Sequence, residues 1–569
     1  MSSATLPRND ELAAQLELLA DLSELEGESS FRVLAYRRAA TRIRETGGPV
    51  AQLALDGKAK SLAGIGATIE GKIVEVVELG EMKALTKRKA LIPEEVVRFM
   101  HLPGLGPKTA RRIWQELGVT TVAELKAAAE GERLRTLAGL GATTEAKILK
   151  ALAETPKDPR ESRRLLGAGL PAVLAVVSVL REHPAAVKVS EAGSVRRRRE
   201  TFRDLDLIAT STDPPALIDY FTKLVWVADV VAKGETKATV ISNDGLRFDL
   251  RVVPPESYGN LLQHFTGSKE HNVALREEAV RRGFSVSEYG ITTTETGEVF
   301  SAEDEEAVYA HLGYAFIPPE LRENGGELAA AREGNLPTLV ERADLCGDLH
   351  SHSTWSDGKA TIEEMALAAR ELGHDYLAMC DHSQRLREGR LERQWEEIDA
   401  LNEWLAPFRI LKGIEVNIRA NGELDLADEL LEQLDWAMAS VHSSFENDPT
   451  GRVLAALENP HVDCIGHLTG RKIGKRLPST IAVERVVERA LATGTFLEIN
   501  SQPDRLDLRD ANARLAGEAG LTLVVSSDGH STGALGYVEL GIAQARRAWL
   551  SKEQILNTRP WAEIEKLLK

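Results

Sequence analysis

The chain has 569 residues, which is too many for one hydrophobic core, so its length predicts several domains. Its start lacks a cationic segment leading into an apolar run, and no stretch of about 18 consecutive apolar residues occurs, so we expect neither an export signal nor a membrane anchor. Three cysteines, Cys346, Cys380 and Cys464, are too few for a disulfide framework, and we interpret them as small buried residues of a protein in a reducing cytosol.

The net charge of −17 is unevenly distributed along the chain. Most of the acidic excess follows residue 340, whereas residues 57–113 carry more Lys and Arg than Asp and Glu. A local basic face can contact phosphates although the whole molecule is acidic. The overall charge therefore does not exclude a nucleic-acid-binding protein.

The first part of the chain is predicted to be helical. Leucines recur at helical spacing from residue 12 onward and predict an apolar stripe, and Arg32, Tyr36, Arg37 and Arg38 give this segment a cationic side.

A Gly-hydrophobic-Gly pattern then occurs three times, each time with an Ile seven residues after the second glycine and a cation just before that Ile. The pattern predicts helix-hairpin-helix turns, because glycines allow a tight turn and expose backbone N–H groups to a DNA phosphate. One copy alone would equally fit an ordinary turn between helices. The third copy, at Gly139 and Gly141, has no cation near its turn and is expected to be structural. The predicted DNA contacts are Gly64, Gly66, Lys72, Gly104, Gly106, Lys108 and Arg112.

Strand-like segments begin near residue 170 and predict a mixed sheet that carries carboxylates. Asp204 and Asp206 alternate with a leucine, so both point to one face of a strand, and a neighbouring strand supplies Asp249. Three carboxylates on one face repel one another unless divalent cations neutralise them. Two Mg²⁺ or Mn²⁺ ions at this position suit nucleotidyl transfer, in which a 3′-hydroxyl attacks and pyrophosphate leaves.

A phosphate-binding turn is predicted just before these aspartates, at Gly193 and Ser194. Ser194 and Arg197 are placed to hold the β- and γ-phosphates of a nucleotide, the arginine by charge-assisted hydrogen bonds. The run from Arg196 to Arg199 also fits a solvated basic patch, and we favour phosphate binding for one of its members.

Beyond a polar stretch at 322–337, we place a domain boundary near residue 340. Short apolar segments there alternate with helical ones and favour a β/α barrel. Histidines and carboxylates follow successive predicted strands, and strand ends converge in a barrel. Such mixed ligands suit Mn²⁺, Zn²⁺ or Fe²⁺ better than Mg²⁺ alone. The predicted ligands are His350, His352, Asp357, His382, Glu415, His442, His467, Asp528 and His530.

Arg471 and Lys472 follow His467 closely. They fit either a contact to a DNA phosphate or a solvated loop, and the sequence leaves both interpretations open.

Taken together, these motifs resemble bacterial family X DNA polymerases with a C-terminal PHP (polymerase and histidinol phosphatase) domain, and the resemblance covers nearly the whole chain. Residues 28–40 are similar to the family's DNA-end-binding domain, and residues 264–268 with Asn272 and Arg276 are similar to its nucleotide-selecting thumb segment. The resemblance implies a multidomain α+β and α/β protein. Its implied parts are a helical DNA-end-binding domain with a helix-hairpin-helix at 1–80, fingers with further hairpins at 81–165, a nucleotidyltransferase palm at 166–252, a thumb at 253–318, a linker at 319–342 and a PHP phosphoesterase barrel at 343–569.

The resemblance also implies roles for individual residues. Asp204, Asp206 and Asp249 would perform two-metal catalysis. Glu415 would bridge metals in a site of up to three ions, where a metal-activated water attacks a phosphodiester. The implied nucleotide-binding residues are Gly193, Ser194, Arg197, Phe265, Gly267, Asn272 and Arg276.

Two positions leave the chemistry open. The family commonly has a Tyr where this chain has His264, so exclusion of ribonucleotides is either weaker here or achieved by Phe265 and the local backbone. Lys72 matches the place of a 5′-deoxyribose phosphate lyase amine in eukaryotic relatives. A plain phosphate contact is the favoured interpretation, because Schiff-base chemistry needs a depressed pKa that no sequence pattern indicates.

The sequence thus predicts a DNA polymerase of base excision repair in the bacterial cytosol, associated with the nucleoid. It would act as a monomer on gapped or primer–template DNA with dNTPs, and its PHP domain would supply 3′-5′ exonuclease, 3′-end-processing or abasic-site activity. A template-independent nucleotidyltransferase is one alternative. A PHP phosphatase for small molecules with a DNA-tethering N-terminal part is another.

Overall fold

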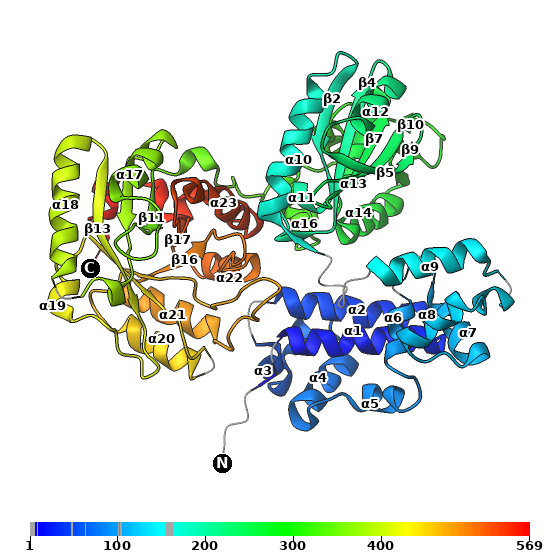
Figure 1. The fold of residues 1–569 in the computed structure, drawn as a ribbon, viewed down its shortest axis with the longest axis horizontal. Coiled ribbons are helices and arrows are strands. Elements are labelled where there is room, and N and C mark those ends of the chain that lie inside the picture. Colours follow the sequence, from blue (N-terminus) through cyan, green and yellow to red (C-terminus); the bar gives the residue numbers. More distant parts are fainter. Residues whose placement is uncertain are drawn as a thin grey trace. The chain divides into compact units, whose positions relative to one another are not determined.

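The computed structural model describes residues 6–7, 9–46, 49–62, 64–100, 102, 105–137, 139–154, 163–387, 389–445 and 447–568. The chain forms two compact units, Met1–Ser162 and Arg163–Lys569 (Figure 1). Among the described residues, no helix has the length and apolar character that crossing a membrane requires. All three cysteines are free; Cys380 and Cys464 are buried as expected, whereas Cys346 is partly exposed.

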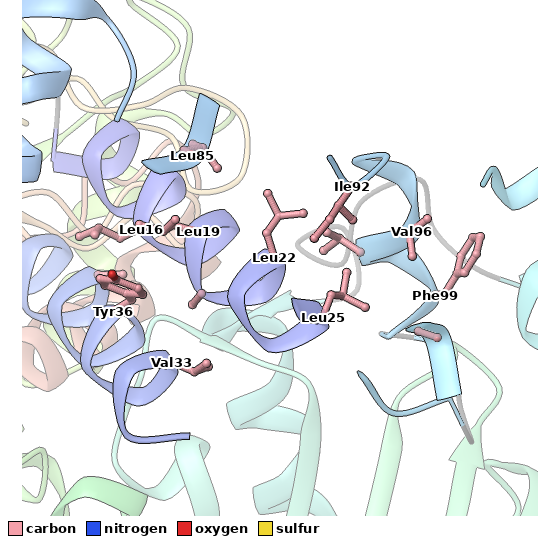
Figure 2. Close-up of a cluster of buried hydrophobic side chains, with 14 of the residues drawn as sticks. Leu16, Leu19, Leu22, Leu25, Val33, Tyr36, Leu85, Ile92, Val96 and Phe99 are labelled. Atoms are coloured by element: carbon pink, nitrogen blue, oxygen red, sulfur yellow. The ribbon is translucent and has the colours of Figure 1, made fainter. Parts of the chain in front are cut away.

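In the described residues of the first unit, all regular structure is helical, and its core lies along α1 (Asn9–Glu26). Figure 2 shows Leu16, Leu19 and Leu22 of α1 among the side chains of α2 (Ser30–Glu45) and of the later helices. The helical spacing of the leucines therefore forms the apolar stripe that the sequence predicts. The remaining helices are α3 (Val50–Leu55), α4 (Ala67–Leu79), α5 (Lys83–Lys89), α6 (Glu95–Phe99), α7 (Pro107–Leu117), α8 (Val122–Glu130) and α9 (Ala142–Glu154).

Each of the three predicted hairpins leads into a helix, namely α4, α7 or α9. Gly64 and Gly139 have φ of +86° and +89°, a backbone conformation that favours glycine. The repeated isoleucines, Ile73, Ile113 and Ile148, are fully buried, so this part of the pattern belongs to the core. Gly104 lies outside the described residues.

The second unit begins with a five-stranded sheet. One pair of neighbouring strands in the interior of this sheet is parallel, and the other three pairs of neighbouring strands are antiparallel. The helices α10 (Leu166–Arg181) and α12 (Pro214–Thr222) pack against the sheet. A two-residue pair, β1 (Arg164–Leu165) and β3 (Thr201–Phe202), accompanies it. The strand order is β2 (Ala186–Glu191), β4 (Asp204–Ser211), β7 (Arg247–Val253), β6 (Lys237–Ser242) and β5 (Val227–Lys233).

A smaller helical segment with a three-stranded sheet follows this sheet and has its own core around Leu275, Ile291 and Tyr309. Its elements are α13 (Tyr258–Thr266), α14 (Lys269–Arg281), β8 (Phe284–Ser287), β9 (Gly290–Thr293), β10 (Val299–Phe300), α15 (Glu305–His311) and α16 (Glu327–Glu333).

The rest of the chain forms a seven-stranded parallel sheet whose strands follow one another in chain order. A bridge between Ser351 and Gly529 links the two ends of the sheet, so the barrel is nearly closed. The predicted β/α barrel is therefore confirmed. Its strands are β11 (Gly347–Ser351), β12 (Tyr376–Met379), β13 (Arg409–Asn417), β14 (Trp436–Ser440), β15 (Cys464–Ile465), β16 (Phe496–Asn500) and β17 (Leu523–Ser526), and its helices are α17 (Ile362–Glu371), α18 (Arg390–Leu405), α19 (Asp428–Leu431), α20 (Pro449–Leu457), α21 (Val483–Thr493), α22 (Asp510–Glu518), α23 (Val538–Arg547) and α24 (Trp561–Ile564).

Ion pairs join the five-stranded sheet region to the barrel within the second unit. Arg471 is buried and lies 2.8 Å from a carboxylate oxygen of Glu200. Both interpretations of Arg471 from the sequence, a DNA phosphate contact and a solvated loop, are therefore wrong, because its guanidinium is enclosed by protein. Arg547 of α23 makes a second link, since it donates to the backbone carbonyl of Arg197 at 2.9 Å and lies 2.6 Å from Asp510 of the barrel.

Candidate active sites

The first candidate site is built on the parallel pair of strands β4 and β7. Asp204 and Asp206 lie two positions apart on β4, so their side chains share one face. Asp206 is paired in register with Asp249 on β7. The structure therefore brings the three predicted aspartates together at one end of the sheet.

The carboxylates of this cluster strongly affect one another. Burial, together with the charges of Asp249 and Asp204, raises the pKa of Asp206 to about 7. Arg247 lies 2.9 Å from Asp249 and 3.6 Å from Asp204, so one guanidinium holds two of the acids. The remaining negative charge makes the cluster fit divalent cations.

Gly193 adjoins this cluster at the start of α11 (Gly193–Arg196). Its φ is +62°, and a Cβ at this position would lie 2.2 Å from Oδ2 of Asp206. Both the backbone conformation and the close approach of the carboxylate therefore require glycine. The backbone N–H of Ala192 also donates to the carbonyl of Asp206, at 2.8 Å, which fixes the predicted phosphate-binding turn against the strand.

The run of arginines after this turn is not a solvated patch, because its members form ion pairs and are largely covered. Arg196 lies 2.6 Å from Glu305, and Arg198 lies 3.2 Å from Glu191. Arg197 lies 3.0 Å from Glu323 and also donates to the carbonyl of Thr266. Burial lowers the pKa of Arg197 below its usual range. Its guanidinium thus lies between the turn and α13.

The predicted nucleotide-selecting segment is held by cations at the end of α13. Arg276 lies 2.8 Å from Nδ1 of His264, and the Asn272 amide donates to the His264 carbonyl at 2.7 Å. The guanidinium of Arg251 lies 4.4 Å from the centre of the Phe265 ring. A Cβ on Gly267 would lie 3.1 Å from Arg197, so this segment adjoins the arginine of the phosphate-binding turn.

Three residues near these groups were missed in the sequence: Arg247, Arg251 and Glu323. Arg247 and Arg251 flank Asp249 at two-residue spacing on β7, so strand alternation alone places all three on one face. That alternation was the signal that could have found the arginines. No local pattern indicates the contact of Glu323 with Arg197.

In the first unit, the predicted DNA contacts that the structure describes lie at or just after the hairpin turns. Lys72 on α4 is partly exposed, and its ammonium lies 6.0 Å from the centre of the Tyr36 ring. Lys108 is exposed on the first turn of α7, and Arg112 further along this helix lies 2.8 Å from Glu116. These cations lie at the surface of the unit, and Arg112 is paired with a neighbouring acid.

The second candidate site lies at the carboxyl ends of the barrel strands. Three groups of ligands form there, and within each group the donor atoms lie within 4.8 Å of one another. Two histidines belong to two groups each, which joins the groups into one cluster. The groups are His352, Asp357, His382 and His530; His350, His352 and Asp528; and His382, Glu415 and His442. His467 adjoins the last group, because its Nε2 lies 3.0 Å from Glu415.

The chemistry of these residues fits bound metal ions. Nε2 of His350, Nε2 of His352 and Nδ1 of His382 are buried without a hydrogen-bond partner among the described residues. Such orphaned ring nitrogens are costly unless they bind a cation. Glu415 is buried amid histidines, whose charges hold its pKa well below the usual range. Imidazole and carboxylate donors in this mixture are typical of Mn²⁺, Zn²⁺ or Fe²⁺ sites.

Two buried acids close to these ligands were missed by the sequence interpretation, and one of them, Glu498, orients a ligand. Glu498 on β16 lies 2.6 Å from Nδ1 of His350 and also accepts from the backbone N–H of His467, at 2.6 Å. Asp381 accepts from Ser353 and from Gln394, at 2.8 and 2.7 Å. An acidic residue inside an otherwise apolar strand, as in Phe496–Asn500, was the available signal for Glu498.

Known protein families match separate segments of this chain. Helix-hairpin-helix families match residues 7–82 and 97–154, the DNA polymerase beta thumb matches 261–323, and the PHP domain matches 348–501. The "DNA polymerase/3′-5′ exonuclease PolX" of Bacillus subtilis (strain 168) is 39% identical over 566 residues, which cover 97% of this chain and 98% of that protein. Probable phosphatases of Thermoanaerobacter sp. (strain X514) and Syntrophotalea carbinolica are 32% and 30% identical, each over 37% of this chain and 89% or 90% of their own length.

The fold and the two candidate sites define a class of protein. Proteins of this class have helical hairpins, a polymerase sheet that carries carboxylates, and a phosphoesterase barrel with metal-ligand side chains, all in one chain. The chain belongs to the family X DNA polymerases with a C-terminal PHP domain, the PolX proteins.

Proposed function

We propose that this chain is a DNA-directed DNA polymerase that fills short gaps during DNA repair, and that its barrel removes nucleotides from 3′ ends. The observation that carries the proposal is the pairing of Asp206 with Asp249 beside the Gly193 turn, in a chain that also contains a separate imidazole–carboxylate cluster. The name of the Bacillus subtilis relative, a DNA polymerase and 3′-5′ exonuclease, supports both activities, since the likeness extends over nearly the whole of both chains.

In the polymerase site, Asp204, Asp206 and Asp249 would hold Mg²⁺ or Mn²⁺. These ions would supply the charge that activates the primer 3′-hydroxyl and stabilises the departing pyrophosphate. The phosphates of a dNTP would bind at Gly193, Ser194 and Arg197.

Residues of the α13–α14 segment would complete this site. Phe265 and Gly267 would face the sugar, and Asn272 and Arg276 would keep the His264 backbone and ring in place through the hydrogen bonds described above. Arg197 is paired with Glu323 in this structure. To bind the nucleotide, its guanidinium would have to give up part of this contact and bind a phosphate oxygen instead.

DNA would be held by the first two helical hairpins through backbone N–H groups and through Lys72, Lys108 and Arg112. Such contacts bind phosphates without reading sequence, which suits a repair enzyme. For Lys72 we propose a phosphate contact, and lyase chemistry is the alternative that a borohydride-trapping assay on a 5′-deoxyribose phosphate end would detect. In this proposal the palm would comprise residues 166–252, the thumb 253–318 and the PHP domain 343–569.

In the barrel, the nine predicted ligands would hold up to three ions of Mn²⁺, Zn²⁺ or Fe²⁺, with Glu415 between two of the groups. Bound ions would lower the pKa of water for attack on a phosphodiester. The protein's own contribution is orientation, because Glu498 accepts a hydrogen bond from Nδ1–H of His350 and so leaves Nε2 facing the cluster. The likeness of this part to probable phosphatases supports a second candidate, a phosphatase for small phosphoesters.

The test is a gapped duplex with a labelled primer, assayed with and without dNTPs in Mg²⁺ and in Mn²⁺. The wild-type protein should extend the primer by templated addition and shorten it when dNTPs are absent. Asp249→Ala should abolish extension and spare shortening, whereas His352→Ala should do the reverse. Addition that ignores the template would favour a template-independent nucleotidyltransferase. Hydrolysis of small phosphoesters without any shortening of DNA would favour the phosphatase.

A further inference from the structure

A cavity of about 320 Å³ opens beside the metal-binding cluster of the barrel, and Asp528 and His530 form part of its wall. The other walls come from separate loops that follow β11, β15, β16 and β17. These loops contribute Lys359, Lys472, Arg505 and Tyr537, respectively. The volume is within the range of small-molecule sites, which measure about 300–1,000 Å³. None of these four residues belongs to the metal-binding groups.

The cations of this cavity exceed the anions that are available to pair with them. Lys472 lies 3.0 Å from Asp504 and is paired. Arg505 lies 3.9 Å from Asp528, a predicted metal ligand whose charge would be shared with an ion. Among the described residues, Lys359 forms no ion pair through its ammonium, although its backbone N–H donates to the His530 carbonyl at 2.8 Å. The surplus positive charge favours an anionic ligand next to the metals.

Tyr537 gives the cavity an aromatic wall. It ends the 3₁₀ segment Thr532–Tyr537, and the residue is 36% exposed, whereas the nearby Leu535 and Val538 are fully buried. The buried neighbours fix the backbone on both sides, so Tyr537 lines the cavity from a packed segment rather than from a free loop. An accessible aromatic face beside cations is the arrangement on which nucleic-acid bases stack.

We propose that this cavity binds the terminal nucleotide of a DNA 3′ end as a nucleoside monophosphate unit, with Lys359 and Arg505 facing its phosphate and Tyr537 stacking on its base. The inference rests on the proposed exonuclease function and specifies the substrate unit of that site. In the reaction, a water oxygen forms a bond to the 5′-phosphorus of the terminal nucleotide. The bond from this phosphorus to the O3′ of the preceding nucleotide breaks, and that oxygen takes up a proton. The products are a nucleoside 5′-monophosphate in the cavity and a shortened 3′-hydroxyl end.

Binding of the product to the full-length protein tests the assignment without turnover. Isothermal titration calorimetry in Mn²⁺ would compare dAMP with inorganic phosphate. Tyr537→Ala should weaken the binding of dAMP by about 10-fold or more and leave the binding of phosphate unchanged, because only the base loses a partner. Tyr537→Phe should retain dAMP affinity, since it retains the ring. Lys359→Gln should weaken both ligands. Tyr289→Ala, which removes an exposed tyrosine between β8 and β9, is the matched control and should change neither.

A cleavage assay separates the failure of this inference from that of the proposed function. Oligonucleotides ending in a normal 3′ nucleotide or in a 3′ abasic nucleotide would be compared. Tyr537→Ala should slow removal of the normal nucleotide and leave the abasic one unaffected. If the wild-type protein shortens DNA but Tyr537→Ala handles both ends and dAMP as the wild type does, the cavity is wrongly assigned. If the wild-type protein does not shorten DNA at all, the proposed exonuclease function, on which the cavity assignment rests, is itself wrong.

Discussion

Glu498 and His350 form a hydrogen bond of 2.6 Å between Oε1 and Nδ1, and both side chains are fully buried. The carboxylate of Glu498 fixes the proton of His350 on Nδ1. The unprotonated Nε2 is then the ring atom that can bind a metal, and it faces Asp528 and Glu415. Acids in this position orient metal-binding histidines and raise their basicity. The ligand set alone therefore does not define the barrel site.

Glu498→Gln is accordingly expected to lower nuclease activity and metal affinity by about 10–100-fold, because the amide either loses the hydrogen bond or selects the wrong tautomer of His350. Metal content measured by elemental analysis, together with DNA shortening in Mn²⁺, checks this expectation. Primer extension in Mg²⁺ should be unchanged, since Glu498 lies in the barrel. Normal metal content and normal shortening would mean that Glu498 serves packing alone.

Gly193→Ala is expected to impair primer extension. The substitution imposes a strained φ, and its Cβ would meet the Asp206 carboxylate, which must move. Gly297→Ala is the matched control, since Gly297 has a φ of +73° and open space around its Cβ. Gly297→Ala should be destabilised by ~1–2 kcal/mol in thermal unfolding and Gly193→Ala by at least as much, but only Gly193→Ala should raise the Mg²⁺ concentration needed for extension. Equal kinetics for the two variants would contradict the role of Gly193.

Arg471→Ala is expected to destabilise the second unit by roughly 3 kcal/mol, because the substitution leaves Glu200 without its partner at a covered junction. Lys223→Ala, which removes an exposed partner of Asp219, should cost less than about 1 kcal/mol. Chemical unfolding of both variants measures the difference. A small cost for Arg471→Ala would show that water reaches this junction.

The sequence predicted most residues of the two clusters that the structure brings together, because each residue lies in a short local pattern. Asp204 and Asp206 are separated by one apolar residue, and the barrel ligands directly follow apolar strands, so periodicity alone places them. The partners that position them were not predicted, because they come from distant segments. Glu498 lies 148 positions from His350. Arg471 was misinterpreted for the same reason, since its partner Glu200 is 271 positions away and no local pattern links the two.

The pH dependence of stability should reveal a second buried network, formed by Glu305 with Arg196 and Arg322. The two guanidinium groups outweigh burial and lower the pKa of Glu305 to about 2, from an ordinary value of 4.5. A depressed pKa means that the stabilisation is complete above about pH 4.5 and is lost as the pH falls toward 2. The shift corresponds to about 3 kcal/mol for this group.

Glu305→Gln should therefore lower the free energy of unfolding at pH 7 and flatten its decline between pH 4.5 and pH 2. Urea unfolding at a series of pH values measures both effects. Glu306→Gln changes the adjacent residue on α15 and is the control, which should retain the wild-type slope. If Glu305→Gln also retained that slope, the acid sensitivity would belong to other carboxylates, such as Glu323, whose pKa the nearby arginines likewise lower to about 2.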